Sequence, residues 1–125
     1  MFEKMRAELV RRLAALTDRY EANGRRAQEA LQFTERATKL GLGGDEHLTR
    51  ALSEIASKSY QQAGLCGEAI TNLTLDRAFP PMFSRNVVKA EAFAAECERV
   101  LDDFEDGQVA GKRAFEQRFG KQEAE

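Results

Sequence analysis

The sequence predicts an all-α protein, an elongated antiparallel bundle of long helices that pack as a coiled-coil-like hairpin. Three observations predict it. Apolar residues recur every 3.5 residues over residues 48–104, at fourteen of seventeen positions when Pro80 is counted as apolar. A similar stripe runs through residues 2–37. One helix over residues 2–40 would be about 58 Å long, which exceeds the diameter of roughly 35 Å expected for a compact domain of this length.

The first helix is predicted over residues 2–40. Its apolar stripe is rich in Leu in the first half and in Ala in the second half, where a neighbouring helix can approach closely. Asn23-Gly24 is its weak point, because Gly costs about 1 kcal/mol relative to Ala inside a helix and Asn-Gly is also a turn signal. The stripe keeps its phase across this pair, which favours one continuous helix. A buried Asn on such a stripe can fix the register of a coiled coil.

A turn is predicted over residues 41–45, which include three Gly residues. Gly readily adopts the left-handed conformation just past the end of a helix, and Asp45 is a favourable N-cap for the next helix. A Gly-rich stretch can also cradle a phosphate group, but no strand precedes this one and no Gly-Lys-Ser/Thr follows it. The helix-turn interpretation is therefore preferred.

A long second helix is predicted over residues 46–106. Its stripe keeps its phase through Pro80-Pro81, so both sides of the prolines face the same way. Because Pro lacks an N–H and its ring collides with the carbonyl four residues before it, the pair predicts a helix that bends here and continues. In the alternative, the prolines begin a new helix, where the first N–H groups have no helical partner anyway.

A C-terminal segment is predicted over residues 107–125, where the apolar pattern loosens. Phe115 and Phe119 fall four residues apart on one helical face, with four basic residues around them. One interpretation is a last amphipathic turn that docks on the bundle. The other is a basic, aromatic segment that contacts a membrane surface.

The composition favours a single domain that does not bind nucleic acid. A chain of 125 residues can bury one moderate core, and a net charge of −2 gives no global basic field. The charge is uneven, however: residues 1–40 carry nine Lys or Arg against six Asp or Glu, and residues 81–125 carry seven against ten. The N-terminal stretch is too charged for a signal peptide, and no apolar run could span a bilayer. We expect a cytoplasmic protein that can associate peripherally with a membrane.

The sequence predicts no catalytic, cofactor-binding or metal site. It holds one histidine, His47, and no Glu-x-x-His pair of the kind that builds helical di-metal centres. It also lacks a Cys-x-x-Cys, a GxGxxG and a Ser/His/Asp grouping. Cys66 and Cys97 both lie on the apolar stripe, which is typical of buried, reduced thiols. We therefore expect a protein that is not an enzyme.

The order of these features resembles the BAR domains of the endophilin and sorting-nexin kind. The resemblance rests on the long first helix, the Gly-Gly turn, and Ala51-Leu52 with thirty residues, counted inclusively, from Ala51 to Pro80. Such domains carry a proline kink in a long second helix, and residues 99–104 (Arg-Val-Leu-Asp-Asp-Phe) resemble their Leu-Asp-aromatic-Asp motif. The likeness covers about residues 27–113. A BAR monomer has three long helices and the sequence predicts two, so the resemblance is to a truncated or shortened member.

The resemblance implies a crescent-shaped homodimer that binds and bends anionic membranes. Such dimers form through the first helix and the start of the second, and here the candidate interface residues are Leu9, Leu13, Leu16, Leu48, Leu52 and Ile55. Basic residues lie on the concave face and at the distal tips of BAR dimers. The C-terminal segment falls at such a tip, and its candidate membrane-binding residues are Lys112, Arg113, Phe115, Arg118, Phe119 and Lys121.

The rival prediction is a helical adaptor that binds no lipid. In this interpretation the apolar stripe is a coiled-coil surface that binds partner helices of other proteins. Apolar residues at seven-residue spacing serve both classes of protein equally well, so the sequence leaves the two alternatives open.

Overall fold

The computed structural model describes the backbone of residues 1–41 and 46–123, and the side chains of those residues up to Gln108 together with that of Gln117. The described chain is all-helical. It contains the long helices α1 (Glu3–Lys39), α2 (Glu46–Thr74) and α3 (Ser84–Glu123), and a short 3-10 helix, η1 (Pro80–Met82), that precedes α3. Among these residues no helix combines enough length with enough apolar character to cross a bilayer.

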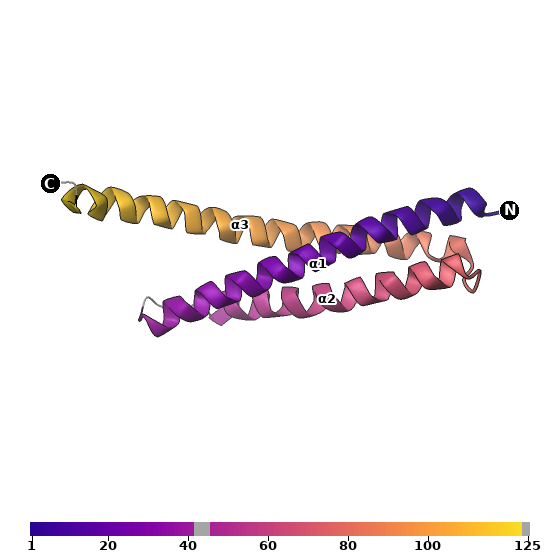
Figure 1. Ribbon diagram of the computed structural model, residues 1–125, viewed down its shortest axis with the longest axis horizontal. Coiled ribbons are helices and arrows are strands. Elements are labelled where there is room, and N and C mark those ends of the chain that lie inside the picture. The colour runs from indigo at the N-terminus through magenta and orange to yellow at the C-terminus, as the bar shows by residue number, and fades with distance from the viewer. Residues whose placement is uncertain (42–45, 124–125) are drawn as a thin grey trace.

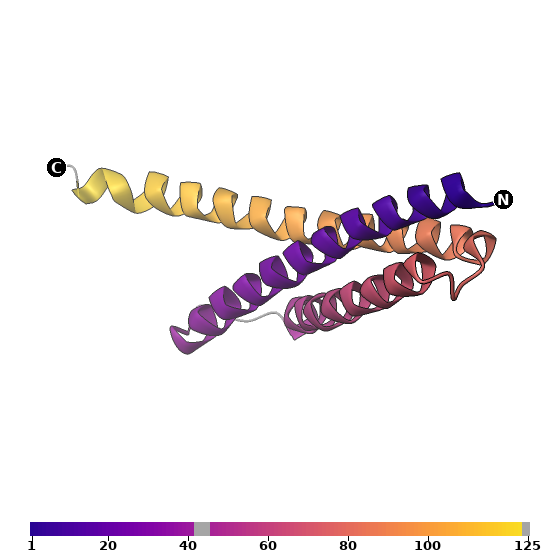
Figure 2. The ribbon, with the colours of Figure 1, turned by 45° about the vertical axis from the view of Figure 1, so that its right-hand side comes forward.

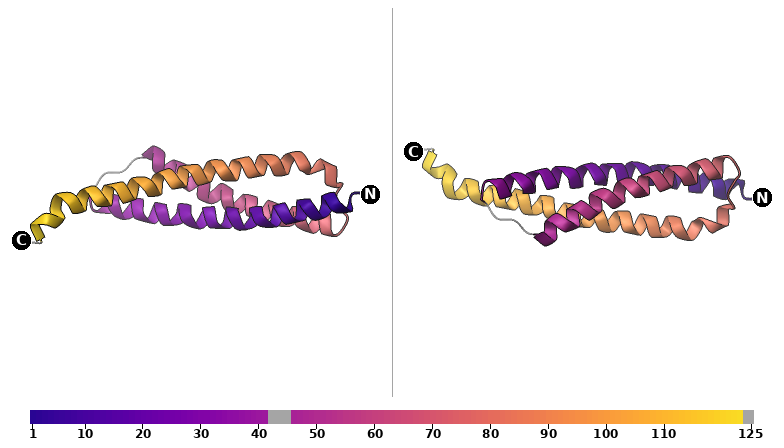
Figure 3. Two further views of the ribbon diagram at one scale, coloured as in Figure 1. Left: turned by 90° about the horizontal axis from the view of Figure 1, so that it is seen from above. Right: turned by 90° about the horizontal axis from the view of Figure 1, so that it is seen from below.

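The three long helices lie lengthwise beside one another. In Figure 1, α1 and α3 run from right to left, whereas α2 runs from left to right. Figure 2 shows α1 beside both of the other helices near the N-terminus and diverging from α3 toward its own C-terminal end. The N-terminus lies beside the connection between α2 and α3, and we call this end of the molecule the turn end. At the opposite end, the last turns of α3 extend past α1 and α2 (Figure 3).

The predicted apolar stripes form the core. On α1 the buried positions include Leu9, Leu13, Leu16, Tyr20, Asn23, Ala27, Ala30 and Thr34, all of which belong to the predicted stripe. The stripe of the second half of the chain is buried as well, from Leu52 to Leu73 on α2 and from Val87 to Leu101 on α3. The spacing therefore predicted correctly which face of each helix is covered.

Helix α1 is continuous through Asn23-Gly24, as the phase of its stripe predicts. Gly24 faces the ring of Tyr60 on α2, and a Cβ atom at position 24 would lie 2.8 Å from two ring carbons. The missing side chain lets the tyrosine ring rest on the backbone of α1. Gly24 is thus a point of close approach between helices and not a turn.

The end of α1 also follows the prediction. The N–H groups of Leu40 and Gly41 donate to carbonyls in the last turn of the helix, and Gly41 has a φ of 72°. This is the left-handed conformation that a glycine adopts directly after a helix. Asp45, the predicted N-cap of the second helix, lies outside the described residues.

The prediction of one kinked helix over residues 46–106 is wrong, because α2 ends at Thr74. Asp76 lies in the left-handed region with a φ of 56°. Its N–H donates to the carbonyl of Leu73 at 3.3 Å, and the N–H of Arg77 donates to the carbonyl of Asn72 at 2.8 Å. These two bonds define a Schellman motif, which closes a helix. An aspartate occupies the position where a glycine would have signalled the helix end.

The prolines begin the next helix and do not bend the previous one. Phe79 is extended, with φ −85° and ψ 109°, as steric hindrance from a following Pro requires. Pro80 then starts η1, where its missing N–H leaves no helical bond unmade. Because the stripe has the same spacing in either direction, its phase did not reveal that the chain reverses here. The expectation that a third long helix is absent is therefore also wrong, since α3 supplies one.

Candidate functional site

The most regular polar feature of the described surface is a row of ion pairs between α1 and α3, which we call the arginine ladder. Arginines seven residues apart on α1 face glutamates seven residues apart on α3: Arg12 pairs with Glu91, Arg19 with Glu98 and Arg26 with Glu105. Seven residues make two turns in a coiled coil, so successive pairs lie two turns further along both helices. This order of pairing requires α1 and α3 to run in the same direction.

Each arginine of the ladder binds its carboxylate through two nitrogens. Arg19 places Nε 3.1 Å from one oxygen of Glu98 and Nη2 2.6 Å from the other. Arg26 binds Glu105 through Nε and Nη2 at 2.9 Å each, and its Nη2 lies 2.7 Å from a carboxylate oxygen of Asp102. Such two-point pairs fix orientation as well as distance. The ladder therefore sets the register of α3 on α1.

The ladder keeps its carboxylates ionised. Hydrogen bonds from Arg12 lower the pKa of Glu91, and hydrogen bonds from Arg19 lower the pKa of Glu98. In the opposite direction, the hydrogen bond to Glu91 raises the pKa of Arg12. A carboxylate with a lowered pKa is a poor proton donor near neutral pH. The ladder is thus suited to holding helices together and not to acid-base catalysis.

A buried polar centre lies beside the ladder. Tyr20 is fully buried, and its hydroxyl donates a hydrogen bond to the backbone carbonyl of Ala90 on α3. Burial raises the pKa of Tyr20 to about 12, so the phenol stays neutral and remains a donor. Asn23, which is also buried, donates through Nδ2 to Glu98 at 3.3 Å. The buried Asn thus joins α1 to α3, in keeping with the register role expected for it.

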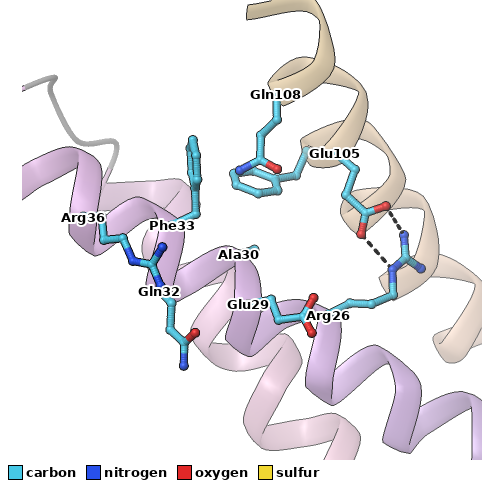
Figure 4. A pocket seen from close by; sticks show the side chains of 9 residues that line it. Arg26, Glu29, Ala30, Gln32, Phe33, Arg36, Glu105 and Gln108 are labelled. Atoms are coloured by element: carbon cyan, nitrogen blue, oxygen red, sulfur yellow. Dashed lines mark hydrogen bonds and ion pairs between the residues drawn. The ribbon is translucent and has the colours of Figure 1, made fainter. Parts of the chain in front are cut away.

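A pocket of about 460 Å³ lies between the C-terminal part of α1 and the middle of α3 (Figure 4). Phe33 and Phe104 meet inside it edge to face, with ring centroids 6.5 Å apart, and Phe33 is 53% exposed. Side chains of both charges surround the rings, and the pocket is lined by Arg26, Glu29, Ala30, Gln32, Phe33, Arg36, Phe104, Glu105 and Gln108. None of these described side chains is a Ser, Cys, His or Lys that could act as a nucleophile. The pocket can hold an apolar group beside its two phenylalanine rings.

A second hollow is a groove of about 330 Å³ between α2 and α3. Its floor includes the buried residues Leu13, Cys66 and Val87, and Leu65 stands at its side with 48% of its surface exposed. Polar side chains such as Gln62 and Asn72 also line it. An apolar floor with a polar rim is the form of groove that accepts an amphipathic helix.

The predicted dimer residues lie inside the single chain. Leu9, Leu13 and Leu16 belong to the core cluster near the turn end, whereas Leu52 and Ile55 belong to the core cluster at the other end. Leu48 is partly buried against that second cluster. Because the first five are already buried in one copy, those five are not a surface through which a second copy binds. The dimer itself stays a prediction that needs another surface.

The predicted membrane-binding residues lie on the last turns of α3. The backbone of residues 112–121 is helical, but the side chains of Lys112, Arg113, Phe115, Arg118, Phe119 and Lys121 lie outside the described part. Contact of this segment with a membrane stays a prediction. Among the described residues, no group of three or more His, Cys, Asp or Glu side chains could hold a metal ion.

Sequence reasoning missed a concentration of exposed apolar side chains at the turn end. The described chain exposes ten large apolar side chains, and six belong to this end: Met1, Met5, Leu75, Phe79, Met82 and Val88. Each was a scattered residue in the sequence, because three separate segments contribute them. Only the reversal between α2 and α3 brings these segments together beside the N-terminus (Figure 1).

The described residues form a helical bundle with hollows between its helices and with exposed apolar side chains at the turn end. Comparisons with protein-family models, curated proteins and solved structures find no match to the chain. Any function must therefore be argued from the residues themselves.

Proposed function

We propose that the protein is a non-enzymatic helical scaffold that works as a homodimer and binds the surface of anionic membranes. The resemblance to BAR domains implies this function. The observation that carries the proposal is the third long helix, α3. A monomer of three long helices agrees with the resemblance, whereas the proline kink in a long second helix, on which the resemblance also rested, is replaced by a chain reversal.

The surface chemistry supports binding without catalysis. In the described part of the chain, the polar side chains with shifted pKa values on α1 and α3 are joined in ion pairs or buried between helices, as in the arginine ladder. Catalytic sites, by contrast, place groups with perturbed pKa values in a cleft where a substrate can reach them. A scaffold needs a stable frame and an exposed contact surface, and the described chain provides both.

The test is co-sedimentation with vesicles. We expect the protein to sediment with vesicles that contain anionic lipid, and to remain in solution with purely zwitterionic vesicles. Binding should fade when the salt concentration rises from 0.05 M to 1 M, because the Debye length shortens to about 3 Å. Light scattering at tens of micromolar should give the mass of a dimer. Absence of binding to anionic vesicles at low salt would refute the membrane function, and a compact monomer would refute the dimer.

The second candidate is the helical adaptor, and the groove between α2 and α3 favours it. Leu65 stands half-exposed beside an apolar floor, and an amphipathic helix of a partner protein would cover it. The vesicle experiment also separates the two candidates. Failure to bind anionic vesicles at low salt would favour the adaptor. In that case the change Leu65→Lys should abolish binding of the partner helix.

A further inference from the structure

The turn end combines apolar exposure with a fixed shape. Met82 is 71% exposed, Leu75 54% and Phe79 53%. Scattered exposed apolar residues are ordinary on a protein surface, but a group of them indicates a contact site. Val88 lies four residues after the start of α3, only about 6 Å along the helix, and so belongs to the same end.

Two contacts fix the N-terminus to the connection between α2 and α3. The rings of Phe2 and Phe79 meet edge to face, with centroids 5.1 Å apart. Arg6 donates to Asp76 at 2.6 Å. The connection is therefore held by α1 on one side and begins α3 on the other. It presents its apolar side chains from a defined surface.

The charge of the turn end is complementary to an anionic surface. Residues 1–8 and 74–89 carry five Lys or Arg residues against three Asp or Glu residues. Two of these three acids are neutralised locally, since Asp76 pairs with Arg6 and Glu8 pairs with Arg11. Four exposed cations of this end form no ion pair with an acid within the described part of the chain: Lys4, Arg77, Arg85 and Lys89.

The face that carries the arginine ladder is less suited to an anionic surface. Arg12, Arg19 and Arg26 are all bound to carboxylates of α3. An arginine that moved to a lipid phosphate would have to leave a two-point ion pair. At the turn end, the unpaired cations and the apolar side chains are available without such a loss.

We propose that the turn end inserts into the headgroup region of an anionic membrane, so that the long axis of the molecule rises from the bilayer. Leu75, Phe79 and Met82 enter the boundary between headgroups and acyl chains, and Arg77 and Arg85 contact lipid phosphates. Apolar insertion flanked by basic residues is the general chemistry of interfacial binding. The inference rests on the proposed membrane function, but it differs from contact through a basic concave face and from contact through residues 112–121.

Fluorescence tests the position of the contact, because the protein has no Trp. Three single reporters are made in the full chain: Met82→Trp at the turn end, Leu40→Trp at the opposite end of α1, and Phe115→Trp in the C-terminal segment. With vesicles of phosphatidylserine and phosphatidylcholine, only the Met82→Trp emission should shift to the blue and be quenched by brominated lipid. A shift confined to Phe115→Trp would overturn the proposal in favour of the C-terminal segment.

Paired variants test the chemistry. Arg77→Gln/Arg85→Gln should weaken vesicle binding about 25-fold at low salt, at about fivefold for each charge. Leu75→Ser/Met82→Ser should weaken it about tenfold. The matched controls are Arg25→Gln/Arg50→Gln and Leu40→Ser, which change exposed residues of the same kinds away from the turn end, and these should bind normally. All variants should keep the helical circular dichroism of the wild type.

The outcomes separate this inference from the proposed function. If the wild type does not bind anionic vesicles, both are refuted. If the wild type binds and the turn-end variants bind equally well, only the end-on contact is refuted. A blue shift of Met82→Trp that grows with protein concentration in the absence of vesicles would assign the turn end to self-association, and this result would also overturn the proposal.

Discussion

The arginine ladder should contribute measurably to stability at its middle step, Arg19–Glu98, whose carboxylate is the least exposed of the three. The Glu98 side chain is 27% exposed and that of Arg19 is 37% exposed. Glu98 accepts hydrogen bonds from two nitrogens of Arg19 and one of Asn23. The change Glu98→Gln keeps the size of the side chain and removes its charge. It also replaces one acceptor oxygen by an NH2 donor, which leaves an arginine donor without its partner.

The expected cost is about 1.5 kcal/mol in the free energy of unfolding. Exposed ion pairs contribute at most about 1 kcal/mol, and removal of one partner of a buried pair costs about 3–5 kcal/mol. The Arg19–Glu98 pair is intermediate in exposure, and hydrogen bonds to charged groups are worth about 1.5–3 kcal/mol. For a domain of this size, such a loss should lower the melting temperature by about 5 °C.

Urea unfolding followed by circular dichroism at 222 nm measures this cost, and its pH dependence identifies the cause. The pKa of Glu98 is lowered in the folded chain. Its carboxylate therefore stabilises the fold above the pKa of the unfolded chain, and this stabilisation is lost as the pH falls through the lower, folded pKa. The difference between wild type and Glu98→Gln should accordingly be full at pH 7 and should shrink in acid.

Glu96→Gln is the matched control on the same helix. Glu96 is 60% exposed and pairs with Arg99 one turn away, so its loss should cost about 0.3 kcal/mol. If Glu98→Gln costs no more than Glu96→Gln, the ladder does not stabilise the bundle. A cost that stays constant from pH 7 into acid would also contradict the reasoning, because it would not depend on the carboxylate charge.

Two further predictions concern the core. Burial raises the pKa of both Cys66 and Cys97, so little thiolate forms near neutral pH. A thiol reagent should therefore label the native protein at least tenfold more slowly than the urea-unfolded protein. Equal labelling rates would contradict the burial of the two thiols. The hydroxyl of Ser59 is buried without a hydrogen-bond partner among the described residues. The change Ser59→Ala should therefore raise the free energy of unfolding by about 1 kcal/mol. At the exposed Ser57, the control Ser57→Ala should change it by only about 0.3 kcal/mol.

The buried faces could be predicted from the sequence because they depend on local periodicity. A helix buries the side on which its apolar residues recur, whatever it packs against. This is why the prediction of the buried stripe of α1 was correct from Leu9 to Thr34, including the buried Asn23. The same argument correctly predicted that α1 continues past Gly24, because a turn would have shifted the phase of the stripe.

The direction of α3 could not be predicted from periodicity. The reversal depends on Asp76 in a left-handed conformation, and an aspartate is a weaker signal for a helix end than a glycine. The two prolines were visible, but they are compatible both with a bend and with a new helix. Once the reversal was missed, the apolar leucines of α1 lacked a third helix to cover them, and a second copy was inferred in its place.

The arginine ladder was present in the sequence as two matching rows, yet its meaning required the topology. Arg12, Arg19 and Arg26 recur every seven residues, and so do three glutamates of α3. The two rows can pair only if both helices run in the same direction. A chain with two helix reversals satisfies this condition, whereas a hairpin with one kinked arm does not. A search for charged residues that share a spacing would have favoured the three-helix arrangement.

The uneven charge of the chain therefore has an internal explanation. Residues 1–40 are basic overall, and residues 91–106 hold seven Asp or Glu against one Arg. In the sequence this segregation suggests a basic surface offered to an external partner. In the structure, much of it is complementarity between α1 and α3. Only charges that remain after this pairing can attract a membrane. At the turn end such cations belong to the same segments as exposed apolar side chains, which is why the contact is argued there and not along the arginine ladder.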